Sequence, residues 1–237
     1  MEPIPVAQDS YTGAVESARG FIAKVYLWMS LGLFVTASVS VAPILILGEV
    51  AYYNLIAENI MIIFGLMIVE LAIVFGLTFL INKIPAVLGF LAFLVYSFLN
   101  GITLSPIFLV YTGASIFSTF LVCAIMFGGT SILGYITKID LTRFGGFLMM
   151  ALFGLLGVMV VNLFLQSNMM SWLISFIGVI LFVGLTAYDT QKIKNMAGSI
   201  DASSEEGKKA SIMGALALYL DFINLFLFLL RLLGRRN

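Results

Sequence analysis

The chain has 237 residues, of which 62% are hydrophobic and 10% charged, and its twelve basic and twelve acidic side chains give a formal net charge of zero. Soluble domains carry about a quarter of their residues as charges, so this composition excludes one, and zero net charge gives no case for a nucleic-acid partner. The apolar residues form continuous blocks of roughly 20 residues, the length that crosses a bilayer as a helix, rather than the alternating segments of a membrane β-barrel. We predict an all-α, polytopic membrane protein embedded in the lipid bilayer.

The first 20 residues contain three acids and two prolines, and no basic region precedes a short apolar core. This pattern is not that of a cleavable signal peptide. We expect a loosely ordered polar N-terminal tail over residues 1–20, followed by a single membrane domain over residues 21–237.

Seven apolar runs follow one another along the chain, and they predict seven transmembrane helices. They cover about 25–47, 60–81, 86–110, 116–136, 147–165, 172–193 and 211–233. A polar stretch at 49–59 and a tight turn at 82–85 separate the first three. Pro106 and Tyr111-Thr112-Gly113 supply turn chemistry inside an uncharged stretch that is too long for one span. The loop at 194–210 is the longest and the most charged.

Basic residues in the connections predict the orientation, because Lys and Arg concentrate on the cytoplasmic side. With a cytoplasmic N-terminus, nine of the twelve basic residues fall on that side and none in the three opposite loops. The other three, Arg231, Arg235 and Arg236, follow the seventh run and would lie outside if that run crosses completely. The side of the C-terminus therefore stays open at this stage.

Three acids lie inside apolar runs: Glu70, Asp189 and Asp221. A charge in hydrocarbon costs roughly 2.5 kcal/mol or more at a helix centre, so such a residue indicates a functional site by default. Asp189 lies near the cytoplasmic end of the sixth run, and Asp221 lies ten residues into the seventh, about 15 Å along a helix. Antiparallel neighbours can bring these two carboxyl groups together, where they would share a proton and titrate as a unit.

Each acid also has a structural interpretation. Asp189 can pair with Lys192, one turn further on, at a helix end that faces water. Asp221 can be a hydrogen-bond anchor, with Tyr219 or Asn224 as its partner. Glu70 can be a protonated packing residue as readily as a functional one.

Other chemistry has little support in the sequence. There is no histidine, which excludes His-based metal sites, general bases and a rhomboid-like Ser-His pair. The one cysteine, Cys123, lies in an apolar run and is expected to be a buried core residue. The surroundings of the two aspartates lack the GxGD pattern of intramembrane aspartyl proteases, so that class ranks a distant third. No phosphate loop, metal cluster or cofactor motif is present, and we expect no cofactor and no enzymatic activity.

The sequences around the two aspartates carry a family resemblance. GLTAYDTQKIK at 184–194 and ALYLDFINLFLFLLR at 217–231 resemble the Bax inhibitor-1, or transmembrane Bax inhibitor motif, family, and the whole chain fits its bacterial inner-membrane members. The resemblance implies seven helices with the last in the centre, and a pH-sensitive calcium leak across the membrane. It also implies that Asp189 and Asp221 are the pH sensor, line the ion path and hold calcium transiently.

Two further positions follow from the same resemblance. A glutamate on the second helix of the family matches Glu70. An arginine later on that helix, which latches the acid pair in some members, is missing here, and Lys83 is the nearest substitute, although an ammonium is a poorer bidentate partner than a guanidinium.

The sequence leaves two functions open. The first is a cation leak pathway, most of all for calcium, because calcium is a hard cation that carboxylate oxygens bind well. The second is a membrane-embedded regulator that binds another membrane protein, such as a protease, through the N-terminal tail or the loop at 194–210.

Overall fold

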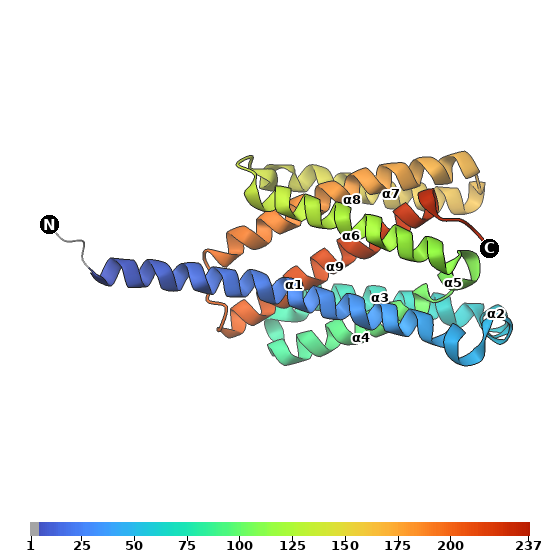
Figure 1. Cartoon of the computed structure of the whole chain (residues 1–237), viewed down its shortest axis with the longest axis horizontal. Coiled ribbons are helices and arrows are strands. Elements are labelled where there is room, and N and C mark those ends of the chain that lie inside the picture. The colour runs from blue at the N-terminus through green and yellow to red at the C-terminus, as the bar shows by residue number, and fades with distance from the viewer. Residues whose placement is uncertain (1–4) are drawn as a thin grey trace. The chain divides into compact units, whose positions relative to one another are not determined.

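The structure is a computed structural model that describes the backbone of residues 5–237 and the side chains of residues 17–237. Over this part the chain is helical, with no strand and one isolated antiparallel bridge between Tyr111 and Arg236 (Figure 1). Seven helices are long and apolar enough to cross a membrane, and they confirm the predicted class. They cover Ser17–Leu47, Ile60–Lys83, Ala86–Val110, Gly113–Ile136, Leu141–Leu165, Asn168–Ala197 and Glu205–Leu233.

The chain forms two compact units. The first unit combines residues 1–105 with residues 193–216. It contains α1 (Pro5–Leu47), α2 (Glu49–Glu58), α3 (Ile60–Leu80), the 3₁₀ turn η1 (Ile81–Lys83) and α4 (Ala86–Leu104). Helix α4 packs against both α1 and α3. The close α1–α4 packing depends on Gly32 and Gly101, because a Cβ on either would lie within 2.7 Å of the facing helix.

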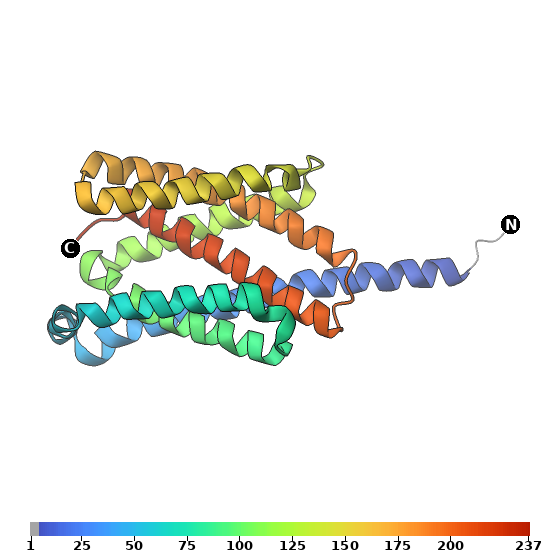
Figure 2. The same ribbon diagram turned by 180° about the vertical axis from the view of Figure 1, so that it is seen from behind.

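The second unit combines residues 106–192 with residues 217–237. It contains α5 (Ile107–Val110), α6 (Gly113–Ile136), the 3₁₀ turn η2 (Leu141–Phe144), α7 (Gly145–Leu165), most of α8 (Asn168–Ala197) and the C-terminal part of α9 (Glu205–Leu233). Helices α7 and α8 form an antiparallel pair, seen from two sides in Figures 1 and 2. The turn between them places Gln166 at a φ of 47°.

Helix α9 is by far the most enclosed of the seven membrane helices. Of its most apolar window 72% is buried, against 6% to 39% in the other six. Large apolar side chains are instead exposed along the other helices, as at Phe64, Phe79, Phe153 and Phe164, which suits a surface that faces lipid tails. A largely buried helix is an element around which a site can be built, and α9 carries Asp221.

Several boundaries differ from those that the sequence predicts. Helix α1 begins at Pro5, so the expected loose tail is helical backbone from that residue on, while residues 1–4 lie outside the described part. The expected polar connection at 49–59 is helix α2. The Tyr52 hydroxyl of α2 hydrogen-bonds with the hydroxyl of Ser105, at the end of α4. The charged loop shrinks to 198–204, because α8 continues to Ala197 and α9 begins at Glu205. The single domain over 21–237 stays a prediction.

The last residues of the chain bind back to the segment between α5 and α6. The N–H of Thr112 donates to the carbonyl of Arg235 at 3.1 Å, and the N–H of Asn237 donates to that of Val110 at 3.0 Å. The N–H of Arg235 donates to the Ser115 hydroxyl at 2.9 Å. Because 110–112 connects the third and fourth spans, the end of α9 lies beside that connection, and α9 is long enough to cross completely.

Candidate functional site

Asp221 lies in the middle of α9 and is almost completely enclosed, with 4% of its surface exposed. Its neighbours along the helix, Leu218 and Leu225, are fully buried. Its Oδ2 atom is the one buried side-chain nitrogen or oxygen without a hydrogen-bond partner among the described side chains. Buried polar groups are nearly always hydrogen-bonded, so this oxygen marks a place where structure alone does not account for the residue.

Helix α6 packs against α9 next to this acid. The Cys123 thiol donates to the carbonyl of Phe222 at 3.6 Å. The Phe222 ring lies between Phe120 and Phe127, at centroid distances of 5.6 and 5.4 Å and with edge-on geometry. These contacts fix the turn of α9 that carries Asp221, and they confirm Cys123 as a buried core residue.

The motif around Asp189 in α8 is held on both sides of the acid. Gly134 of α6 lies so close to Ala187 that a Cβ on it would be 2.5 Å from the Ala187 carbonyl oxygen. Gly145 of α7 lies equally close to the Tyr188 side chain, because a Cβ on it would be 2.7 Å from the Tyr188 hydroxyl. On the other side, the Gln191 side chain accepts from the N–H of Leu141 at 2.7 Å and donates to the carbonyl of Ile139 at 2.8 Å.

Asp189 itself forms no hydrogen bond and no ion pair within the described part of the chain, although it is half-buried. It lies within electrostatic range of Asp221 on one side and of Lys192 on the other. Both acids belong to the second unit, and their role as a pair stays a prediction. The alternative in which Lys192 neutralises Asp189 would need a closer contact, since the described side chains contain one ion pair within 4 Å, Arg143–Asp140.

The structural interpretation of Asp221 gains no support from Asn224. The Asn224 amide donates to the backbone carbonyl of Leu220 at 2.8 Å, one turn back along α9. If Asn224 anchored Asp221, its amide would instead donate to the Asp221 carboxyl group. Asn224 remains near the site by its position one turn beyond Asp221.

Glu70, in the first unit, has the partners that Asp221 lacks. It is 7% exposed and accepts from the Asn100 amide at 3.1 Å and from the Thr103 hydroxyl at 2.8 Å, both on α4. Tyr96 lies within electrostatic range. Sequence reasoning did not find Asn100 and Thr103, although their spacing of three residues on one face of a predicted helix is a signal for a shared partner.

The comparison with known families decides what these motifs belong to. The sequence pattern of the family described as "Inhibitor of apoptosis-promoting Bax1" matches residues 18–237, which include both acidic motifs. The chain belongs to the Bax inhibitor-1 family. The resemblance carried by residues 184–194 and 217–231 is confirmed.

Relatives within the Bax inhibitor-1 family are similar over nearly their whole length. The inner membrane protein YbhL of Escherichia coli strain K12 is 49% identical over 230 residues, 97% of both chains. An uncharacterized protein of Rickettsia prowazekii is 41% identical over 222 residues, covering 94% of this chain and 92% of its own. An uncharacterized membrane protein of Streptococcus pyogenes serotype M1 is 37% identical over 228 residues, 96% of this chain and 97% of its own.

The Bax inhibitor-1 resemblance also raised Lys83 as a substitute for the missing latch arginine. Lys83 is exposed at the end of η1, in the first unit, and the described side chains give it no ion pair. Its role as a latch stays a prediction.

The chemistry of the acid pair limits what it can hold. Calcium takes six to eight oxygen ligands, and no group of three or more His, Cys, Asp or Glu side chains gathers among the described residues. Two carboxyl groups can attract and release a cation in passing, but they do not form a resident calcium site by themselves.

Proposed function

We propose that this protein is a pH-sensitive leak pathway for cations, above all calcium, and that Asp189 and Asp221 form its sensor and line its path. The observation that supports it most is the enclosed Oδ2 of Asp221, which has no hydrogen-bond partner in the described part of the chain and has a second carboxyl group within electrostatic range. A non-enzymatic role belongs to the same proposal.

The physical argument starts from the cost of an isolated carboxylate. In low dielectric such a group takes up a proton or attracts a cation. Protons and cations would compete for the same oxygens, so the occupancy of the pair by cations would depend on pH. Asp189 acts electrostatically on Asp221, and Lys192 acts on Asp189.

We also propose that the protein lies in the bacterial inner membrane with its N-terminus in the cytoplasm. The name of the Escherichia coli relative and the seven apolar helices support the location, and the distribution of basic residues in the loops supports the orientation.

The test is calcium flux into liposomes that contain the purified protein, measured between about pH 6 and pH 8. We expect wild-type flux that changes with pH, and a flux reduced at least tenfold, without that pH response, in Asp221→Asn. Asp189→Asn should retain flux with a weaker pH response, because the second acid remains. Unchanged flux and pH response in both variants would reject the acid pair.

The regulatory alternative has its own signature in the same preparation. A wild-type protein that gives no flux, together with a membrane protein recovered in equal amount by cross-linking and pull-down, would favour a regulator over a leak pathway. The N-terminal residues and the loop at 198–204 are then the regions to delete first.

A further inference from the structure

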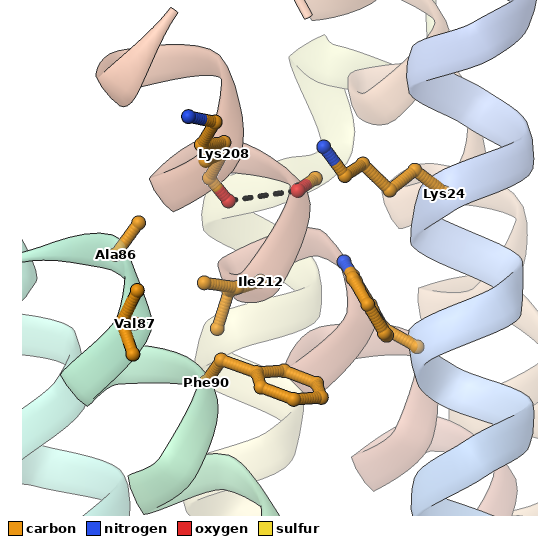
Figure 3. Close-up of a pocket in the computed structure, with 8 residues that line it drawn as sticks. Lys24, Ala86, Val87, Phe90, Lys208 and Ile212 are labelled. Atoms are coloured by element: carbon orange, nitrogen blue, oxygen red, sulfur yellow. Dashed lines mark hydrogen bonds between the residues drawn. The ribbon is translucent and has the colours of Figure 1, made fainter. Parts of the chain in front are cut away.

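A cavity opens between α1, α4 and α9 in the first unit, whereas the acid pair belongs to the second unit. Its volume is about 170 Å³. Figure 3 shows Lys24 on α1 and Lys208 on α9 at its mouth, with Ala86, Val87 and Phe90 of α4 and Ile212 of α9 around the interior. The proposed cation pathway uses none of these residues.

Each helix contributes to the cavity at two levels. Lys24 is followed one turn later by Trp28, and Lys208 by Ile212, while Phe90 lies one turn after Ala86. One turn of helix advances about 5.4 Å, so each lysine lies about one turn before the apolar interior, towards the N-terminus of its helix. The Trp28 and Phe90 rings, 4.4 Å apart between centroids, form one wall of that interior.

The two lysines have no carboxylate partner of their own within the described part of the chain. Glu205, three residues before Lys208, accepts from the N–H of Ala86 at 2.6 Å and so caps the start of α4. Ser211 is also satisfied, because its hydroxyl donates to the Lys208 carbonyl at 2.7 Å (Figure 3). The mouth of the cavity therefore offers two positive charges that form no ion pair with the described side chains.

The size of the cavity argues against an enclosed small molecule. Pockets that enclose whole ligands measure roughly 300–1,000 Å³, and this one is smaller and opens beside exposed apolar side chains such as Val87, 69% exposed. An occupant would be partly inside and partly in the surrounding medium. That is the geometry of an acyl chain in a bilayer, whose headgroup lies at the level of the helix ends.

We propose that this cavity binds one anionic phospholipid from the leaflet on the side where α4 and α9 begin. Lys24 and Lys208 bind the headgroup phosphate, and one acyl chain lies against Trp28, Phe90 and Ile212. Basic pockets between membrane helices on the cytoplasmic side bind such headgroups, and a compact ammonium is an effective point-charge ligand for phosphate. The chosen partner follows from the charges at the mouth and the apolar interior together.

The experiment is a lipid titration followed by native mass spectrometry of the detergent-purified full chain. Dioleoyl phosphatidylglycerol serves as the anionic lipid and dioleoyl phosphatidylcholine as the zwitterionic one. We expect one phosphatidylglycerol to bind in preference to phosphatidylcholine. The apparent Kd should rise roughly fivefold in Lys24→Gln or Lys208→Gln, and roughly 30-fold in the double variant.

Two control proteins make the result specific. Lys83→Gln combined with Lys138→Gln removes two exposed basic charges outside the cavity, and it should bind phosphatidylglycerol as wild type does. Val87→Trp keeps both lysines and fills the cavity edge, so it should weaken binding of the anionic lipid by at least fivefold while the protein remains monodisperse.

Three results would overturn the proposal. Equal binding of the two lipids by wild type would indicate a site for acyl chains alone. Equal losses in the control and cavity double variants would indicate a general charge effect. A lipid-free dimer that Val87→Trp dissociates would indicate that a second copy of the chain covers the cavity.

Discussion

Two buried acids, one in each compact unit, differ in what surrounds them. Glu70 on α3 is 7% exposed and Asp221 on α9 is 4% exposed, so burial does not separate them. Glu70 receives hydrogen bonds from Asn100 and Thr103, whereas Oδ2 of Asp221 receives none from the described side chains. The two acids therefore differ in their hydrogen bonds and not in their burial: Glu70 links α3 to α4, and Asp221 has an oxygen without a partner among the described side chains.

The strongest way to break this contrast is to displace the support of Asp189 while leaving Glu70 untouched. Gly134→Leu puts a side chain into the Ala187 backbone, where even a Cβ would be 2.5 Å from the carbonyl oxygen. Because backbone cannot move aside as a flexible side chain can, we expect a loss of about 3 kcal/mol or more. The measurement is thermal melting in detergent.

The matched control is Gly157→Leu on α7, where a Cβ would meet nothing within 4 Å. It should melt as wild type does. If the two variants have the same melting temperature, the close approach of α6 and α8 is not what holds the Asp189 motif.

Glu70→Ala should give the next largest effect, because it removes the acceptor of two hydrogen bonds in a buried place. Leaving such donors unpaired costs roughly 1–3 kcal/mol. Thr103→Val should cost less, because Glu70 keeps its hydrogen bond from the Asn100 amide. Melting curves of the two variants in one detergent test the order, and a Glu70→Ala protein as stable as wild type would place Glu70 with the functional acids.

Asp221→Asn should change stability by less than about 1 kcal/mol, or raise it, since it removes a charge from an enclosed place without removing a hydrogen bond to Oδ2. The same variant should lose flux at least tenfold. This separation of stability from flux sharpens the contrast with Glu70, and a large drop in melting temperature would instead identify Asp221 as a structural anchor.

The smallest effect is expected at the exposed Asp140. The Thr142 hydroxyl, the Thr142 N–H and Arg143 lower the pKa of this carboxyl group below its usual value of 3.8. A lowered pKa gives a contribution that is complete above the usual value and is lost only as pH falls through the folded value. Asp140→Asn should therefore leave the flux response between about pH 6 and pH 8 unchanged, and a flattened response in the flux assay would move the sensor from α8 and α9 to this turn.

The sequence predicts the spans well because uncharged runs of about 20 residues have few alternatives in a helical membrane protein. Pro106 and Tyr111-Thr112-Gly113 located the break that the structure places between α4 and α6. The sequence predicts a polar connection at 49–59 because the composition of α2, with Glu49 and Glu58 at its ends, does not differ from that of a loop.

The candidate site was only partly predictable for a related reason. The three acids stand out because a charge in an apolar run is rare, and the family motifs place Asp189 and Asp221 together. Asn100 and Thr103 do not stand out, because uncharged polar residues are common in membrane helices. Which acid receives their hydrogen bonds depends on how α3 and α4 pack, and no local pattern contains that information.

The pairing of the C-terminal residues with 110–112 has a practical consequence for how this protein is handled. The carbonyl of Val110, the N–H of Thr112 and the Ser115 hydroxyl all form hydrogen bonds with the final residues of the chain. A purification tag or topology reporter fused directly after Asn237, or a truncation at Gly234, would perturb that pairing along with its intended target. Reporters of membrane topology on this chain are best joined through a long flexible linker, with an untagged protein measured alongside.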